Sequence, residues 1–308
     1  MRLLKIMLLL LAATAGVAVL AYEEGKKAAE TMDFMLLLTC FISQILFVIG
    51  MILLVAMLIS LAHTTVARIA GRGAQTVYSV TGFVGTPVHE LSHALMCIVF
   101  GHKIREMRLY QPKAEDGVLG YVKHSYSKTS IYQQIGNFFI GVAPILIGSA
   151  LLMLLMRWLV PDIFSSVTQD MRSAGNLLMR GANGSTVATY FALLGKFFWR
   201  VFALKNFGNI LWWVFLILAM MISMHMKLSR ADIKGGFVGF LFLAGAILLM
   251  DFILCMVSSS ALQTVTTAMI FGSASLLGFL LVSLVFSGVS VGVAFALSTV
   301  AGIIRRVF

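Results

Sequence analysis

The chain has 308 residues, of which 60% are hydrophobic and 11% are charged, and its formal net charge is +11. A soluble domain has about 45–50% apolar and about 25% charged residues, so this composition excludes a soluble globular protein. Several apolar runs reach the roughly 20 residues that a helix needs to cross about 30 Å of hydrocarbon. These runs are continuous and do not alternate, which excludes a β-barrel. We therefore predict an all-α polytopic membrane protein with about 6–8 transmembrane helices embedded in the lipid bilayer.

The positive charge is explained by membrane orientation. Lys and Arg residues lie in short stretches between the apolar runs, where positive charge is retained on the cytoplasmic side, so we expect no nucleic-acid partner. Residues 102–130 hold six of these basic residues and residues 226–235 hold three. If both stretches are cytoplasmic, the helix over 76–100 runs from outside to inside. A small chain of this kind suits a multi-pass protein of a bacterial cell membrane.

The N-terminal region, residues 1–75, contains two apolar stretches. The first, 3–21, follows two basic residues, and residues 1–21 are either a cleaved signal peptide or a first spanning helix. The second stretch predicts a clear span at about 34–61.

The next apolar helix is expected over 76–100, and it ends at Gly101, a residue that commonly follows a helix. Basic and apolar residues are interleaved over 102–130, and Gly117 and Gly120 interrupt them. This pattern predicts a small β-hairpin associated with the membrane surface.

The remainder of the chain is expected to add several spans and one insertion. The spans are predicted at about 136–159, 207–225 and 236–257. The final apolar stretch, 263–304, is long enough for two spans with a plausible break near Gly288, and the number of C-terminal spans stays open. The insertion is a loop at 161–206, within which Val187 to Phe202 has the pattern of an amphipathic interfacial helix.

One apolar helix carries the sequence His89-Glu90-Leu91-Ser92-His93. Side chains four residues apart project from the same helix face, so His89 and His93 can both reach one Zn²⁺ ion. Glu90, beside the first histidine, can accept a proton from zinc-activated water and pass it to a leaving amine. With six His and six Glu in the chain, a shuffled sequence would contain this pattern roughly twice in a thousand trials, so its occurrence indicates a metal site.

A catalytic zinc needs a third protein ligand and an open position for water. The sequence leaves several candidates: Asp232, His225, Asp251, Asp116, Glu115, His102 and His124. Asp232 lies between two spans, near the level of the membrane surface, and its carboxylate can face the motif helix. The alternative for Asp232 is a helix cap or an ion pair with Arg230 or Lys234.

The other thiols and imidazoles carry weaker signals. Cys40, Cys97 and Cys255 lie in apolar segments, so we expect buried free thiols and neither a disulfide nor a thiolate metal site. His102 is expected to reach toward the membrane interface, and His124 is expected to be exposed on the hairpin.

The motif resembles the catalytic helix of the site-2 protease family, which are intramembrane zinc metalloproteases. The resemblance rests on Gly85 to Leu95 with Phe100-Gly101-His102-Lys103-Ile104, on Gly141-Val142-Ala143-Pro144 in the next span, and on the later Leu228-Ser229, Asp232 and Gly235. It implies His89, His93 and Asp232 as zinc ligands and Glu90 as the general base. It also implies a catalytic membrane core at 76–257, followed by a C-terminal transmembrane region at 258–308.

Two functions therefore compete. The first is a zinc-dependent intramembrane endopeptidase that cleaves peptide bonds in or near the transmembrane segments of a membrane-protein or peptide substrate. The second is a non-catalytic membrane scaffold or transporter-type protein that retains a structural or vestigial metal site. The sequence favours the first because of the specificity of the motif, and it leaves the substrate, the cleavage site and the oligomeric state open.

Overall fold

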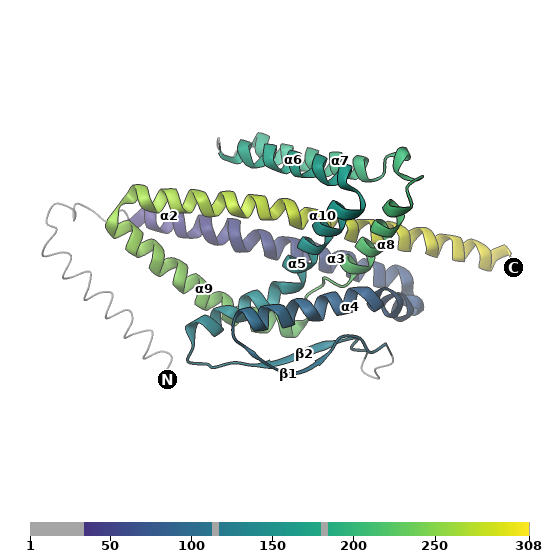
Figure 1. Ribbon diagram of the computed structural model, residues 1–308, viewed down its shortest axis with the longest axis horizontal. Coiled ribbons are helices and arrows are strands. Elements are labelled where there is room, and N and C mark those ends of the chain that lie inside the picture. Colours follow the sequence, from purple (N-terminus) through teal and green to yellow (C-terminus); the bar gives the residue numbers. More distant parts are fainter. Residues whose placement is uncertain (1–33, 113–116, 180–183, 308) are drawn as a thin grey trace, which may run out of the picture.

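The structure is a computed structural model that describes residues 34–112, 117–179 and 184–307. This part of the chain is mostly helical, with one two-stranded antiparallel hairpin (Figure 1). Residues 1–21, expected to be a signal peptide or a first helix, lie outside the described residues. The α-helices are α2 (Phe34–Gln44), α3 (Met51–Ala70), α4 (Ala74–Val99), α5 (Ile131–Leu159), α6 (Pro161–Met179), α7 (Gly184–Val201), α8 (Ile210–Met224), α9 (Arg230–Val257) and α10 (Ser259–Val307).

Short irregular turns connect some of these helices. A π-helical turn, η1 (Ile45–Gly50), joins α2 to α3, and the 3₁₀ turns η2 (Gly71–Gly73) and η3 (Leu204–Asn206) precede α4 and α8. Because η1 does not interrupt the helical path, α2 and α3 form one long apolar segment over Phe34–Ala70.

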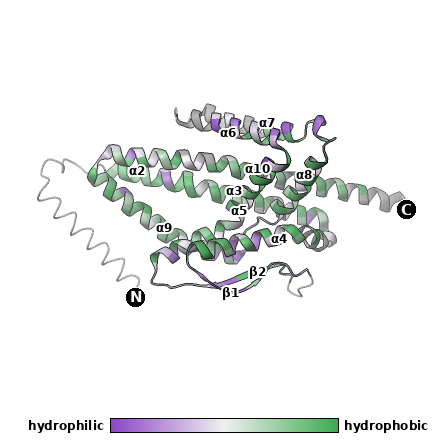
Figure 2. Cartoon of the chain, in the orientation of Figure 1, coloured by the Kyte–Doolittle hydropathy of each residue, from purple (hydrophilic) through white to green (hydrophobic). Residues whose placement is uncertain are grey.

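Four helical segments of the described chain are long and apolar enough to cross a membrane, as expected of a multi-pass membrane protein. They are Phe34–Ala70, Ile131–Leu159, Arg230–Val257 and Leu276–Val300. Figure 2 shows α2, α3 and α9 as mostly hydrophobic, whereas the hairpin strands carry many hydrophilic residues. We predicted six to eight over the whole chain, and one of the predicted stretches, 3–21, lies outside the described residues. The helix α8 has only 15 residues, and α4, which carries the polar motif, is not among the four segments.

In the C-terminal part, the stretch 263–304, which was long enough for two spans with a plausible break near Gly288, lies within the single helix α10 of 49 residues. One segment of this helix, Leu276–Val300, is a candidate span. No heavy atom lies within 4 Å of the position that a Cβ of Gly288 would take. A glycine inside a helix costs only about 1 kcal/mol relative to alanine, and this is too little to break a long helix by itself.

The segment 161–206, predicted as a loop, instead contains the helices α6 and α7 (Figure 1). Helix α7 agrees with the amphipathic helix expected over Val187 to Phe202, whereas α6 was not predicted. Pro161 and Asp162 stand in the first turn of α6, where proline fits and an acidic side chain favours the helix dipole. An ion pair between Asp170 and Arg200 joins the two helices.

Helix α5 is buried along most of its length and packs closely against α9. Glycines allow this approach. A Cβ on Gly239 of α9 would lie 2.1 Å from the backbone nitrogen of Phe138, and one on Gly141 of α5 would lie 2.6 Å from the carbonyl oxygen of Asp232. Small residues at a membrane helix interface permit this close backbone contact, and here the contact sets the position of the start of α9.

The predicted hairpin is confirmed, and it lies beside α4 in Figure 1. Its strands are β1 (Lys103–Arg108) and β2 (Tyr121–Ser125), which pair antiparallel with Lys103 opposite Ser125 and Arg108 opposite Tyr121. The register of the pairing shifts between Ile104 and Glu106. No third strand pairs with either strand in the described part of the chain, so each strand has one edge without a strand partner.

Candidate metal centre

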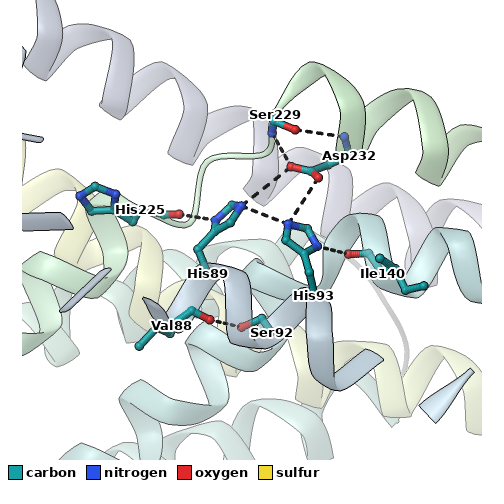
Figure 3. A network of polar contacts seen from close by, with 8 residues as sticks. All are labelled: Val88, His89, Ser92, His93, Ile140, His225, Ser229 and Asp232. Atoms are coloured by element: carbon teal, nitrogen blue, oxygen red, sulfur yellow. Dashed lines mark hydrogen bonds and ion pairs between the residues drawn. The ribbon is translucent and has the colours of Figure 1, made fainter. Parts of the chain in front are cut away.

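The two motif histidines lie one turn apart on α4 and face the same space (Figure 3). Their Nε2 atoms are 3.1 Å apart, and their rings cross at 73° with centroids 4.8 Å apart. His93 is buried, and the His89 side chain keeps an exposure of 14%. The helical spacing thus directs one nitrogen of each ring to a common point.

Backbone carbonyl groups set the orientation of both rings. The His89 Nδ1 atom is 2.6 Å from the carbonyl oxygen of His225, and the His93 Nδ1 atom is 2.8 Å from that of Ile140. A carbonyl oxygen only accepts hydrogen bonds, so each Nδ1 must carry a proton that it donates. In the neutral rings both Nε2 atoms then carry lone pairs, as in metal-binding histidines whose other nitrogen donates to a carbonyl.

Asp232 completes the group from the first turn of α9. Its Oδ1 atom is 3.3 Å from the His93 Nε2, and its Oδ2 atom is 3.9 Å from the His89 Nε2. One donor atom from each of the three residues lies within 4.8 Å of the others. Ligands at ~2.05 Å from a tetrahedral zinc are separated by about 3.3 Å, so the three residues fit a zinc ion with only a small adjustment at His89.

Asp232 is also part of a capping box. The Ser229 hydroxyl accepts a hydrogen bond from the Asp232 backbone nitrogen at 3.1 Å, and the Asp232 carboxylate accepts one from the Ser229 backbone nitrogen at 2.6 Å. From the sequence, a helix cap was the alternative to a ligand role for Asp232. The geometry is compatible with both roles. Because the cap uses one lone pair of Oδ2, it holds the carboxylate in place and leaves Oδ1 free to face the Nε2 atom of His93.

The other candidates for a third ligand lie elsewhere. The ring of His225 contacts the hydroxyls of Thr81 and Thr86 at 3.0 and 3.3 Å, and only its backbone carbonyl reaches the motif. Asp251 lies deep in α9 and accepts a hydrogen bond from Gln44 of α2 at 2.9 Å. Glu115 and Asp116 fall outside the described residues. Of the five candidates that lie within the described residues, only Asp232 joins the histidine pair, and its role as a ligand stays a prediction.

Glu90 of α4 is buried at 6% exposure, and its side chain lies against the hairpin segment. A Cβ on Gly120, the residue before β2, would lie 2.9 Å from the Glu90 Cγ and 2.7 Å from the Thr86 Cγ2. Only glycine allows the hairpin to lie this close to the motif. Within the described chain the Glu90 carboxylate makes no hydrogen bond, so its oxygens are available to a water or a substrate.

The carbonyl of His225 reaches His89 because α8 approaches α4 closely. A Cβ on Gly85 would lie 2.3 Å from the carbonyl oxygen of Met221 and 2.5 Å from the His225 ring. We did not predict from the sequence that Gly85 allows α8 to approach α4, or that the carbonyls of His225 and Ile140 orient the two histidine rings. The only available signal was Gly85 itself, which precedes the motif in the segment that resembles the protease family.

A second group of donor atoms, from Cys97, His102 and His124, lies within 4.8 Å of one another. Contrary to our expectation, His102 is buried at 5% exposure, and His124 is half-buried. Burial lowers the pKa of both histidines. The neighbouring His102 lowers that of His124 further, and the hydrogen bond to Gln133 opposes the shift of His102. Both rings are therefore held toward the neutral form.

Comparison of the chain with protein-family models, with curated proteins and with solved structures finds no match. The description of the site therefore rests on its own residues and geometry. These define a helical membrane protein in which two imidazole nitrogens and a carboxylate from two helices converge beside a buried glutamate.

Proposed function

We propose that the protein is a zinc-dependent intramembrane endopeptidase that cleaves peptide bonds in or near the transmembrane segments of a membrane-protein or peptide substrate. The observation that carries the proposal is the pair of Nε2 atoms 3.1 Å apart, with both Nδ1 protons committed to carbonyls. Two lone pairs at this distance repel each other, and a cation between them and the carboxylate of Asp232 relieves the repulsion.

The donor set identifies the class of ion. Two imidazoles and one carboxylate are the protein ligands of many catalytic zinc sites, in which a fourth position stays open. His89, His93 and Asp232 would hold the ion. When bound, zinc supplies a Lewis acid that polarises a carbonyl group and increases the acidity of water.

The remaining residues of the site would handle protons and substrate. Glu90 follows the first ligand and makes no competing hydrogen bond in the described chain, so it can take a proton from the attacking water and donate it to the leaving amine. The substrate helix must unwind locally before its carbonyl is accessible. An unwound strand could then pair with an outer edge of the hairpin by β-augmentation, and Gly120 brings that hairpin against Glu90.

The test compares the wild-type protein with Glu90→Gln and with Asp162→Asn, the same change of carboxylate to amide at an exposed residue of α6, which serves as the matched control. Membranes of cells that produce each protein are analysed by mass spectrometry for new N-termini in or beside apolar segments, and zinc is measured in each purified protein. We expect wild type and Asp162→Asn to generate the same new termini, and Glu90→Gln to generate none while it retains zinc.

Two outcomes contradict the proposal. If Glu90→Gln generates the same termini as the wild type, Glu90 is not the base. If the wild type holds zinc but generates no termini beyond those of Glu90→Gln, the scaffold or transporter function is favoured.

A further inference from the structure

The second cluster, formed by Cys97, His102 and His124, joins the end of the motif helix to the hairpin. Cys97 lies in the last turn of α4 and is fully buried, His102 follows the turn at Gly101, and His124 lies on β2. Cys97 also stands four residues beyond His93, so the two clusters occupy successive turns of one helix face. The described structure gives Cys97 no disulfide partner.

Hydrogen bonds set the protonation pattern of His102. Its Nε2 atom lies 2.9 Å from the carbonyl oxygen of Gln133, so Nε2 carries the proton and Nδ1 carries a lone pair. That lone pair faces the Nδ1 atom of His124 at 3.0 Å. When the His124 proton is on Nε2, two lone pairs and the Cys97 sulfur face one point. His89 and His93 are oriented by carbonyls in the same way.

Gln133 is itself held in place by the segments on both sides of the cluster. Its side-chain nitrogen donates to the carbonyl oxygen of Gly101 at 2.7 Å, and its side-chain oxygen accepts from the Ser127 backbone nitrogen at 2.6 Å. One residue of α5 thus fixes the turn before His102, the ring of His102 and the chain after β2. This second layer of hydrogen bonds is typical of residues that position metal ligands.

We propose that Cys97, His102 and His124 form a second metal site, distinct from the motif site, which takes a zinc-class divalent ion and fastens the hairpin to α4. One thiolate and two imidazoles suit borderline-soft ions such as Zn²⁺ and Co²⁺ and disfavour Mg²⁺ and Ca²⁺. On binding, the Cys97 sulfur releases its proton to solvent and forms a bond to the metal, with no change in oxidation state. The bound ion links β2 to the C-terminal end of α4 and so stabilises the position of the hairpin that lies against Glu90.

The experiment uses cobalt as the probe, because only the second cluster contains sulfur. The purified full-length protein is loaded with Co²⁺, and its ion content and near-ultraviolet absorption are measured. We expect two ions per wild-type chain and a sulfur-to-cobalt charge-transfer band. Cys97→Ser should lose the band and one ion, whereas Cys40→Ser, a matched change of another buried free cysteine, should keep both.

His124→Gln changes a ligand on the hairpin instead of one on α4, and it should lose one ion and the band with it. His93→Ala separates this proposal from the proposed function, because it should lose the motif ion and keep the band. A wild-type protein with the band but no ion at the motif would support the second site and contradict the protease. A band that is absent from the wild type, or that persists in Cys97→Ser, overturns the second site and leaves the motif untouched.

Discussion

Replacement of Gly141 by alanine tests whether the packing of α5 against α9 sets the metal centre. A Cβ at this position would lie 2.6 Å from the carbonyl oxygen of Asp232 and 3.0 Å from the Cα of Gly236, both backbone atoms. Ordinary contact begins at 3.4 Å, so the start of α9 must move away by about 0.8 Å. Overpacking of this kind typically costs about 1–3 kcal/mol of stability.

The same displacement should weaken metal binding. Metal–ligand distances are held to within about 0.2 Å, so a shift of about 0.8 Å in the backbone that carries Asp232 exceeds what the site tolerates. Changes that misplace a ligand commonly cost about 10–100-fold in metal affinity, and we expect a loss in this range for Gly141→Ala. The assay is zinc competition with a chromogenic chelator on purified protein, together with thermal unfolding of the metal-free form.

Gly235→Ala is the matched control, because it changes a glycine in the same first turns of α9 with no heavy atom within 4 Å of the new Cβ. It should leave zinc affinity unchanged and raise stability by up to about 1 kcal/mol, since alanine is the better helix former. The reasoning fails if Gly141→Ala folds and binds zinc as tightly as the wild type, or if both variants lose affinity equally.

Three further substitutions address other parts of the structure. Ser229→Ala removes the hydroxyl that caps α9; we expect a loss of about 1 kcal/mol in unfolding free energy, and weaker zinc binding in the chelator assay because Asp232 is less firmly held. Gly120→Ala should push the hairpin away from Glu90, so that the generation of new N-termini falls while zinc content is unchanged. Asp251→Ala leaves one of the two N–H groups of the buried Gln44 amide without an acceptor, while the other still donates to Thr266; it should cost about 1–3 kcal/mol in thermal unfolding with no change in zinc content.

The sequence was sufficient where a periodic rule applies. The spacing of His89 and His93 determines that they share a helix face, and the interleaved residues with glycines of 102–130 predicted the hairpin, which the structure shows. The sequence was insufficient where only the length of an apolar run was available to predict the number of spans. An apolar run of 42 residues is compatible with two spans or with one long helix such as α10, because no local residue forces a break.

Contacts between distant segments could not be predicted either. The pairing of Ile104 with His124 depends on a register that includes an irregularity, and a slip of one residue would turn His124 to the opposite face of the hairpin. Cys97 and His102 were therefore expected to be an isolated thiol and an interfacial imidazole, although the fold places them with His124.

The geometry of the candidate metal centre depends on close helix packing more than on the motif helix itself. An isolated helix could present His89 and His93 on one face, but neither ring would have a preferred tautomer, since the carbonyls that accept their Nδ1 protons belong to the end of α8 and to α5. Glycines allow both approaches: Gly85 lets the end of α8 lie against α4, and Gly136 lets α5 lie against Phe100 at the end of α4. Every residue has a backbone carbonyl group, so the sequence does not show which residues orient the histidines. It does show the glycines that allow the neighbouring helices to come close enough. Glycines that flank an HExxH motif in an apolar helix, or that lie in the helices packed against it, therefore indicate where ring-orienting carbonyls approach.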